Sequence, residues 1–485
     1  MSNLVDAYDV IIIGAGLSGL CAARCIRDRC PAVNFKVMEQ STKAGGQLDG
    51  FKSRWITSNN FHATELCREL GVVLVEMGQL VPKHSDCDLS GLQDITPFPG
   101  HLFGTLSKIE SEQLVAEFDS LCSSRFVIED PMNMDVFLER KLLLNASKEF
   151  FRFLIKINCG FSAEELSVTD WIKFCRSLSS TSSAYEMLTK SDTHLIPIEG
   201  WSELVAKLVE AVGIENITFS NKITRVEYSS EDFALVWDEK GRCSMAKTVI
   251  CAVSCNELIR IDFIPFRPIC FKAPNSTSNF THVTNFRTQY QSCLWRNHHY
   301  SGTLFRPSFR IICFEKDNQT LEGSFFHLAN LNDYEIKCAI LNIISLSFGC
   351  RSLLYPNTFE MARQELPFHF EVPVVYSRRL IFSSSNASCW YRGFNNGSVQ
   401  AGNKAAILAL LEVRPQSVSY KDVTDTQCVL FKYSHQLSTG KRFWRTINFS
   451  SVSRFAAAFA TLAASLKVIL QMGKNLSGLN ELETE

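Results

Sequence analysis

Gly14, Gly16 and Gly19 stand at the spacing that holds the phosphates of a dinucleotide. In such a pattern the first glycine permits a tight turn, the second lets backbone approach a pyrophosphate, and the third lets a helix pack closely on a strand. A helix that begins in this turn presents N–H groups and the positive end of its dipole to the phosphates. Glu39 follows where an acidic side chain can accept hydrogen bonds from ribose hydroxyls.

Three elements must position these residues. The run Asp9-Val-Ile-Ile-Ile13 is short, continuous and β-branched, which is typical of a strand buried on both faces. An apolar helical pattern follows over residues 17–25, and Phe35-Lys-Val-Met38 predicts a second strand that ends at Glu39. Because the glycine pattern follows a strand, opens a helix and is completed by an acid, it predicts a dinucleotide-binding βαβ unit.

Composition narrows the class of protein. A chain of 485 residues that is 46% hydrophobic and 20% charged is expected to form about two globular domains. A net charge of −1 gives no electrostatic case for binding nucleic acid. The 18 cysteines are scattered without a C-x-x-C pair, so we interpret them as mostly free thiols. His298-His299 has no further ligand at a suitable spacing, so we expect no metal site.

Further glycine-rich and apolar segments follow the first unit in a defined order. Gly45-Gly46-Gln47 comes six residues after Glu39, and Ile223-Thr-Arg-Val226 follows a glycine-initiated helix. Near the end stand Phe382-Ser-Ser384-Ser385-Asn386 and Gly393-Phe394-Asn-Asn-Gly. The order of these segments resembles that of the flavin-containing amine oxidases. Trp295-Arg-Asn-His-His-Tyr is similar to a segment of the monoamine oxidases in particular, so the chain resembles a divergent member close to that branch.

The resemblance implies the fold, the cofactor and its contacts. It implies an α/β architecture with a Rossmann-like FAD-binding domain interleaved with an α+β substrate domain, plus a C-terminal apolar helix. The expected FAD contacts are Gly14, Gly16, Gly19, Glu39, Gly46, Gln47, Val226, Ser384 and Ser385. Phe394 would form one wall of an aromatic slot for a small-molecule amine. Cys350 lies in a setting similar to that of a flavin-linking cysteine, but it ends a helical pattern, so we expect non-covalent FAD.

Several residues depart from the family pattern around the cofactor. Gln47 stands where the family has an arginine, so a charge-assisted phosphate contact worth about 1.5–3 kcal/mol would be weakened. Ser53 and Arg54 stand where the family has a glycine pair beside the flavin ring. Asn285 stands at the position of the family's lysine, which holds a water against flavin N5.

The closing motif departs as well. Ser384 and Asn386 replace a glycine and a glutamate, and Phe394 replaces a tyrosine, keeping the ring but losing the hydroxyl. No side chain is an evident general base, as is usual in the family, so no catalytic residue is assigned beyond Asn285 at the lysine position.

The resemblance also divides the chain. We expect the FAD-binding domain in segments 1–80, 195–270 and 379–413, and the substrate domain in 81–194 and 271–378. Residues 414–485 form a tail in which 450–473 resembles a membrane helix. Lys467 interrupts its apolar run, which is shorter than the span of about 20 residues that a bilayer needs. The alternative is an alanine-rich amphipathic helix packed on the protein or lying at an interface.

Two functions remain open on the sequence. The first is FAD-dependent oxidation of a primary or secondary amine to an imine and aldehyde, with release of hydrogen peroxide. The second is a catalytically impaired relative that acts as a nucleotide-binding or interaction protein. The resemblance further implies membrane association facing the cytosol, as at the mitochondrial outer membrane, against a cytoplasmic alternative, and it is compatible with a homodimer.

Overall fold

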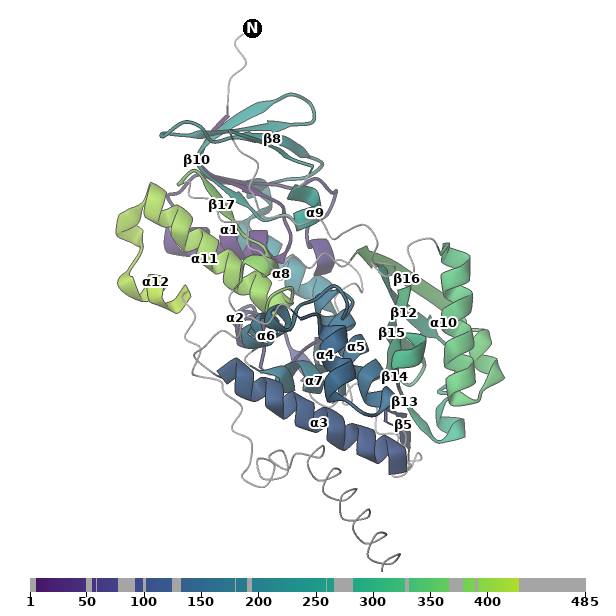
Figure 1. The fold of residues 1–485 in the computed structure, drawn as a ribbon. Helices are drawn as coiled ribbons and strands as arrows, with labels where there is room; N and C mark the ends of the chain where they lie inside the picture. Colours follow the sequence, from purple (N-terminus) through teal and green to yellow (C-terminus); the bar gives the residue numbers. More distant parts are fainter. Residues whose placement is uncertain are drawn as a thin grey trace, which may run out of the picture.

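The computed structural model describes residues 6–48, 55–57, 59–76, 92–98, 102–123, 132–178, 180–189, 194–258, 260–265, 282–327, 331–365, 378–388 and 391–426. These residues form three β-sheets and the helices that pack on them (Figure 1). The predicted membrane helix at 450–473 lies outside the described residues, as do Ser53 and Arg54. Within the described part of the chain, no helix is long and apolar enough to cross a membrane.

The largest sheet has eight strands, seven of them in the order β11-β8-β9-β10-β1-β2-β7, and β17 also pairs with β10. Strands β1, β2, β7, β10 and β17 run parallel to their neighbours in this group, whereas β9 is antiparallel to β8 and β10. The bounds are β1 (Asp6–Ile13), β2 (Phe35–Met38), β7 (Ile217–Thr218), β8 (Ile223–Glu227), β9 (Ala234–Asp238), β10 (Cys243–Cys251), β11 (Asp262–Ile264) and β17 (Leu380–Phe382). Three separate stretches of chain therefore build one sheet.

Helices α1 (Leu17–Arg29), α8 (Trp201–Val212) and α11 (Asn395–Val413) pack beside one another against this sheet (Figure 1). The apolar residues that predicted β1, from Val10 to Ile13, are buried between the layers. Helices α1 and α11 approach so closely that a Cβ at Gly402 would lie 2.4 Å from the Ser18 carbonyl oxygen. This close crossing fixes the beginning of α1 against a segment from the far end of the chain.

A second sheet has six strands in the order β16-β12-β15-β14-β13-β5, with α10 (Asp333–Phe348) covering one face (Figure 1). Along β12 the side chains alternate: Val283 packs toward the helical layer described below, and Phe286 packs in the cluster that contains the buried residues of α10. The strands are β5 (Gln93–Ile95), β12 (His282–Gln289), β13 (Tyr300–Arg306), β14 (Ile311–Asp317), β15 (Thr320–His327) and β16 (Thr358–Glu365).

Helices from the middle of the chain form a layer on the other face of this sheet, where aromatic rings are concentrated. Phe150 and Phe153 of this layer pack against Phe305 of the sheet, with ring centroids 5.9 and 5.3 Å apart. We call the buried rings of this layer and the facing strands the aromatic cluster: Phe98, Phe118, Phe150, Phe151, Phe153, Trp171, Phe174, Tyr185, Phe305, Phe314, Phe326 and Tyr391. The helices are α3 (Leu102–Ser123), α4 (Met134–Lys141), α5 (Asn145–Cys159), α6 (Val168–Ser177) and α7 (Thr181–Thr189).

Smaller elements join these layers. A three-stranded sheet in the order β3-β6-β4 shares an apolar cluster with α2 and α8, through Ile56, Leu66 and Leu204. The remaining bounds are β3 (Ile56–Thr57), β4 (Leu74–Glu76), β6 (His194–Pro197), α2 (Phe61–Glu69), α9 (Cys255–Leu258), α12 (Tyr420–Thr426), and the 3₁₀ turns η1 (Gly46–Leu48), η4 (Ile214–Asn216), η5 (Arg296–His298), η6 (Pro307–Phe309), η7 (Arg351–Leu354), η8 (Ser385–Ala387) and η9 (Pro415–Ser417). The predicted α/β fold class is confirmed, whereas the exact domain boundaries stay a prediction.

Candidate functional site

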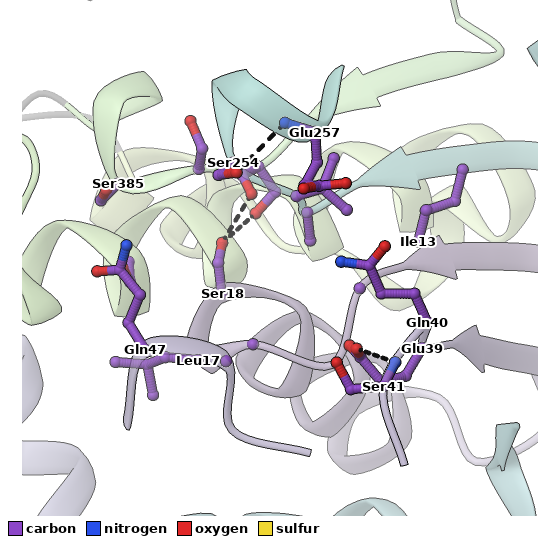
Figure 2. A pocket seen from close by; sticks show the side chains of 18 of the residues that line it. Ile13, Leu17, Ser18, Glu39, Gln40, Ser41, Gln47, Ser254, Glu257 and Ser385 are labelled. Atoms are coloured by element: carbon purple, nitrogen blue, oxygen red, sulfur yellow. Dashed lines mark hydrogen bonds between the residues drawn. The ribbon is translucent and has the colours of Figure 1, made fainter. Parts of the chain in front are cut away.

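A cavity of about 420 Å³ opens at the carboxyl ends of four parallel strands of the large sheet (Figure 2). The residues that directly follow β1, β2, β10 and β17 all line it, namely Gly14, Glu39, Ala252 and Ser383. Ligands of open α/β sheets bind at this edge, because the loops there diverge and helices begin there. The cavity volume also falls within the range of small-molecule sites.

The first glycine turn shapes one wall of the cavity. Gly14 has φ +102°, and a Cβ there would lie 2.9 Å from the Ala252 carbonyl oxygen. A Cβ at Gly19 would lie 2.0 Å from the Gly14 carbonyl oxygen, so this glycine allows α1 to pack on the turn. At Gly16, by contrast, a Cβ would meet no atom within 4 Å. Gly14 and Gly19 therefore allow close packing within the protein, whereas Gly16 leaves open space for a ligand.

The second glycine turn packs on the first. Gly45 forms a bridge with Gly16, and its N–H donates to the Ala15 carbonyl at 2.9 Å. Gly46 and Gln47 follow in η1, and both line the cavity. This arrangement brings the predicted residue Gln47 beside the N-terminus of α1, which carries neither an acidic side chain nor a side-chain cap.

Glu39 is fixed at the opposite side of the cavity from Gln47 (Figure 2). Its carboxylate accepts hydrogen bonds from the N–H groups of Ala15 at 2.6 Å and Ser41 at 2.8 Å, and only 8% of the residue is exposed. A carboxylate offers about four lone-pair directions. Two backbone donors therefore hold the group in place and leave it able to accept from a pair of ribose hydroxyls.

A segment from the C-terminal half of the sequence completes the cavity. Strand β17 delivers Ser383, Ser384 and Ser385, and the Ser383 N–H donates to the Cys251 carbonyl at 2.8 Å. The buried Ser383 and Ser18 hydroxyl oxygens lie 2.6 Å apart, which ties this segment to the first turn of α1. The predicted residues Ser384 and Ser385 thus lie at the site.

Phe394 stands at the N-cap of α11, where it lines the cavity and also meets the aromatic cluster. Its ring centroid lies 6.5 Å from that of Phe174 and 6.4 Å from that of Tyr391. Burial raises the pKa of Tyr391, so its phenol stays protonated at neutral pH. The nucleotide cavity and the aromatic cluster therefore meet at Phe394.

Two predicted residues do not line the cavity. Val226 is wholly buried in the core of the large sheet, and Ile223 at the start of the same strand lines the cavity instead. The strand enters the sheet from the cavity edge and Val226 lies three residues further in, and its predicted contact with FAD stays a prediction. Gly19 acts behind the surface, through its close approach to Gly14.

Asn285 lies in β12 of the six-stranded sheet, buried and outside the cavity lining. Its side-chain oxygen accepts a hydrogen bond from the Ser324 hydroxyl of the neighbouring strand. Asn285 lies two residues after Val283 on the same strand, so both point to the same face of the sheet. Val283 packs with the aromatic cluster, and Asn285 therefore faces the helical layer rather than α10. Its predicted role in positioning water stays a prediction.

Cys350 is a packing residue. It follows α10, is 7% exposed, and lies in the apolar cluster between the six-stranded sheet and that helix. Its carbonyl accepts from the Ser345 hydroxyl at 2.9 Å. It is not among the described residues that line the cavity.

Sequence reasoning missed most of the side chains at the ribose side of the cavity. Asn221 and Lys222 precede β8, and Glu257 and Arg260 follow β10, where an ion pair of 2.8 Å joins the last two. These residues carry no motif. Only the expectation that strand ends gather at one edge of the sheet could have indicated them.

Trp55, next to the undescribed pair Ser53-Arg54, is described by the structure. Its ring stacks on that of His194 with centroids 4.3 Å apart, and it meets the edge of the Phe314 ring at 5.0 Å. A large ring therefore joins β14 of the second sheet to β6 of the small sheet, in a segment for which the family pattern has glycines.

Comparisons with known proteins agree with this geometry. The family model described as flavin containing amine oxidoreductase matches residues 17–351. The chain belongs to this family. A probable flavin-containing monoamine oxidase A from Dictyostelium discoideum is 22% identical over 385 residues, covering 71% of this chain and 81% of that protein. The FAD-containing monooxygenase EthA from Mycolicibacterium smegmatis is 37% identical over 57 residues, only 12% of either chain.

Solved structures share the fold. Cyclohexylamine oxidase from Brevibacterium oxydans superposes with a TM-score of 0.66 at 19% identity, covering 83% of this chain and 98% of that one. A putrescine oxidase variant gives a TM-score of 0.65 at 18% identity, covering 83% and 98%. FAD is the cofactor of the family. The open space at Gly16, the acid at Glu39 and a lining that includes both Glu39 and Phe394 fit it.

Proposed function

We propose that this protein is an FAD-dependent oxidoreductase that oxidises a primary or secondary amine. For a primary amine the overall reaction is RCH₂NH₂ + O₂ + H₂O → RCHO + NH₃ + H₂O₂. Bound FAD would act as the oxidant, accepting a hydride from the carbon next to nitrogen. The protein would supply binding, orientation and exclusion of water.

One observation carries the proposal. Phe394 borders the nucleotide cavity and contacts the aromatic cluster through Phe174 and Tyr391. An isoalloxazine that extends along the cavity from Gly16 toward the N-terminus of α11 would therefore end at an apolar, aromatic wall. Such a wall suits a small amine, because aromatic faces attract the cationic form and an apolar setting favours the neutral form that reacts.

The other residues at the cavity divide the binding of FAD among them. Glu39 would accept from the ribose hydroxyls, and the turn at Gly16 with the first turn of α1 would hold the diphosphate. The N-terminus of α11, a helix of 19 residues, would place its positive end at the flavin side. Cys350 lies outside the cavity lining, which supports non-covalent binding.

The substrate class follows from the family and from Phe394, and two relatives illustrate its range. Their names describe oxidases of putrescine and of cyclohexylamine, which are both primary amines. An amine with an apolar body would match the aromatic cluster of this chain better than a diamine with two charges.

Turnover can be tested on the purified full chain loaded with FAD. Benzylamine, cyclohexylamine, putrescine and a secondary amine are supplied in turn, and oxygen uptake, the carbonyl product (a ketone from cyclohexylamine, an aldehyde from benzylamine and putrescine) and peroxide are measured. The proposal predicts these three in a ratio of one to one to one for at least one amine. Phe394→Ala should raise KM for that amine while the flavin stays bound, and Phe359→Ala, in the second sheet, is the matched control.

A catalytically impaired relative is the alternative, and the same experiment decides between them. FAD retained without peroxide from any amine would favour the alternative. Membrane association of segment 450–473 facing the cytosol, as at the mitochondrial outer membrane, is a proposal that rests on the resemblance, and so is a homodimer. Flotation of the full chain with phospholipid vesicles tests the first, and sedimentation equilibrium tests the second.

A further inference from the structure

A pair of hydroxyl groups joins two distant segments that line the cavity. Ser18 lies in the first turn of α1, and Ser383 directly follows β17, 365 residues away in sequence. Both line the cavity and both are more than nine-tenths buried. Their hydroxyl oxygens are 2.6 Å apart, and Ser18 Oγ also lies 3.1 Å from the Ser383 carbonyl oxygen (Figure 2).

Either hydroxyl can be the donor in the short contact, and the number of protons links its direction to that of the bond to the carbonyl. Each hydroxyl has one proton to donate and two lone pairs to accept. If Ser18 donates to the Ser383 carbonyl, the short contact between the hydroxyls must be a bond from Ser383 to Ser18. The Ser18 proton can then turn from the carbonyl to a ligand in the cavity, while Ser383 continues to donate to Ser18 Oγ. A hydroxyl that accepts a hydrogen bond becomes a stronger hydrogen-bond donor itself.

The charges around the cavity show why such a donor matters. Among the described lining residues the positive side chains are Lys222 and Arg260. Lys222 follows Asn221, whose N–H donates to the Glu39 carbonyl at 2.8 Å, so it lies on the ribose side. Arg260 is paired with Glu257. Beside the turn at Gly16, the described lining has no cationic side chain: its polar groups are Gln47, the serine hydroxyls, the backbone N–H groups and, on the ribose side, the Glu39 carboxylate.

We propose that Ser383 is a cofactor-positioning residue, whose hydroxyl orients and strengthens Ser18 as a donor to the FAD diphosphate, which is held there by neutral groups rather than by a cation. The proposal rests on FAD binding, as does the proposed function, but it does not require amine turnover. It makes two claims that can be measured separately. The effect of each serine on the Kd for FAD depends on the presence of the other, and the Kd for FAD depends only weakly on salt.

The test is isothermal titration of the full chain, freed of FAD, with FAD at 50 and 500 mM NaCl. Ser383→Ala and Ser18→Ala should each raise Kd about threefold to tenfold, as expected for one hydrogen bond. Because Ser383 acts through Ser18, the double variant should match Ser18→Ala within about twofold. Ser345→Ala removes another buried hydroxyl, with a 2.9 Å bond, far from the cavity, and should leave Kd unchanged.

Three results would overturn the proposal. The first is a Kd for Ser383→Ala equal to that of the unaltered chain, and the second is a double variant whose fold-increase in Kd is the product of the two single increases. The third is a Kd that rises more than about tenfold with salt, which indicates a cation on the phosphates. If Ser383→Ala does not fold, Ser383→Cys replaces it, because a thiol is a weak donor of similar size. A chain that binds FAD without oxidising amines refutes the proposed function alone, whereas a chain that binds no FAD overturns both.

Discussion

Replacing Gly16 by alanine separates the binding of FAD from the stability of the fold. Gly16 has φ −72° and ψ 178°, an extended conformation open to any residue, and its new Cβ would meet no protein atom within 4 Å. Glycine-to-alanine changes at compatible positions stabilise by about 0.4–1 kcal/mol through the unfolded chain. Alanine is a poorer N-cap than glycine, which offsets part of this gain. The free energy of unfolding without FAD should therefore change by less than about 1 kcal/mol.

The same methyl group would occupy the space that the structure leaves for the diphosphate. Displacing a phosphate by an ångström or more breaks hydrogen bonds to a charged group, each worth about 1.5–3 kcal/mol. A loss of about 2 kcal/mol corresponds to a Kd about thirtyfold higher. Gly16→Ala should thus bind FAD at least about thirtyfold more weakly while it melts normally in the absence of FAD.

Gly19→Ala is the matched control in the same turn. Its Cβ would lie 2.0 Å from the Gly14 carbonyl oxygen, so α1 must move away from the turn. Overpacking of this kind costs about 1–3 kcal/mol or more, and we expect a lower melting temperature with or without FAD. Circular dichroism melting and FAD titration together distinguish the variants. Normal FAD binding by Gly16→Ala, or a melting temperature as low as that of Gly19→Ala, would refute this role of Gly16.

Three further predictions concern other parts of the molecule. Glu315→Gln leaves the charge of Arg296, whose side chain is only 10% exposed, uncompensated, and it should lower the free energy of unfolding by about 3 kcal/mol in urea titrations. A change below about 1 kcal/mol would contradict this. Burial lowers the pKa of Lys156 to about 8, whereas the unfolded side chain keeps its proton to about pH 10.4. Below pH 8 the folded protein therefore holds an unfavourable buried charge. Lys156→Met should stabilise the folded state by about 2 kcal/mol at pH 7, and by progressively less toward about pH 10.5. A stabilisation that does not depend on pH would contradict this cause. Acid precipitation of the FAD-loaded protein should release all of the flavin, and flavin that stays in the pellet and is lost in Cys350→Ser would show a covalent link.

The sequence predicted the parts of the site that depend on local signals. The apolar run up to Ile13, the glycine turn and the strand before Glu39 all appear where they were expected, because hydrophobic period and glycine spacing act within a few residues. The second glycine turn at Gly46 also lines the cavity, as the resemblance implied.

The parts that could not be predicted depend on contacts between distant segments. Whether Val226 or Ile223 borders the cavity is decided by how β8 pairs with β9 and β11 in the sheet. The contact between Ser18 and Ser383 spans 365 residues and carries no periodic signal. The hydrogen bond from Ser324 to Asn285 depends in the same way on the register of β12 against β15.

The visible spectrum of the purified full chain, recorded anaerobically before and after addition of an amine, tests the central claim most directly. We expect flavin absorption bands that bleach with the amine and return when oxygen is admitted. A colourless protein that takes up no added FAD would contradict it, and so would bound flavin that no primary or secondary amine bleaches.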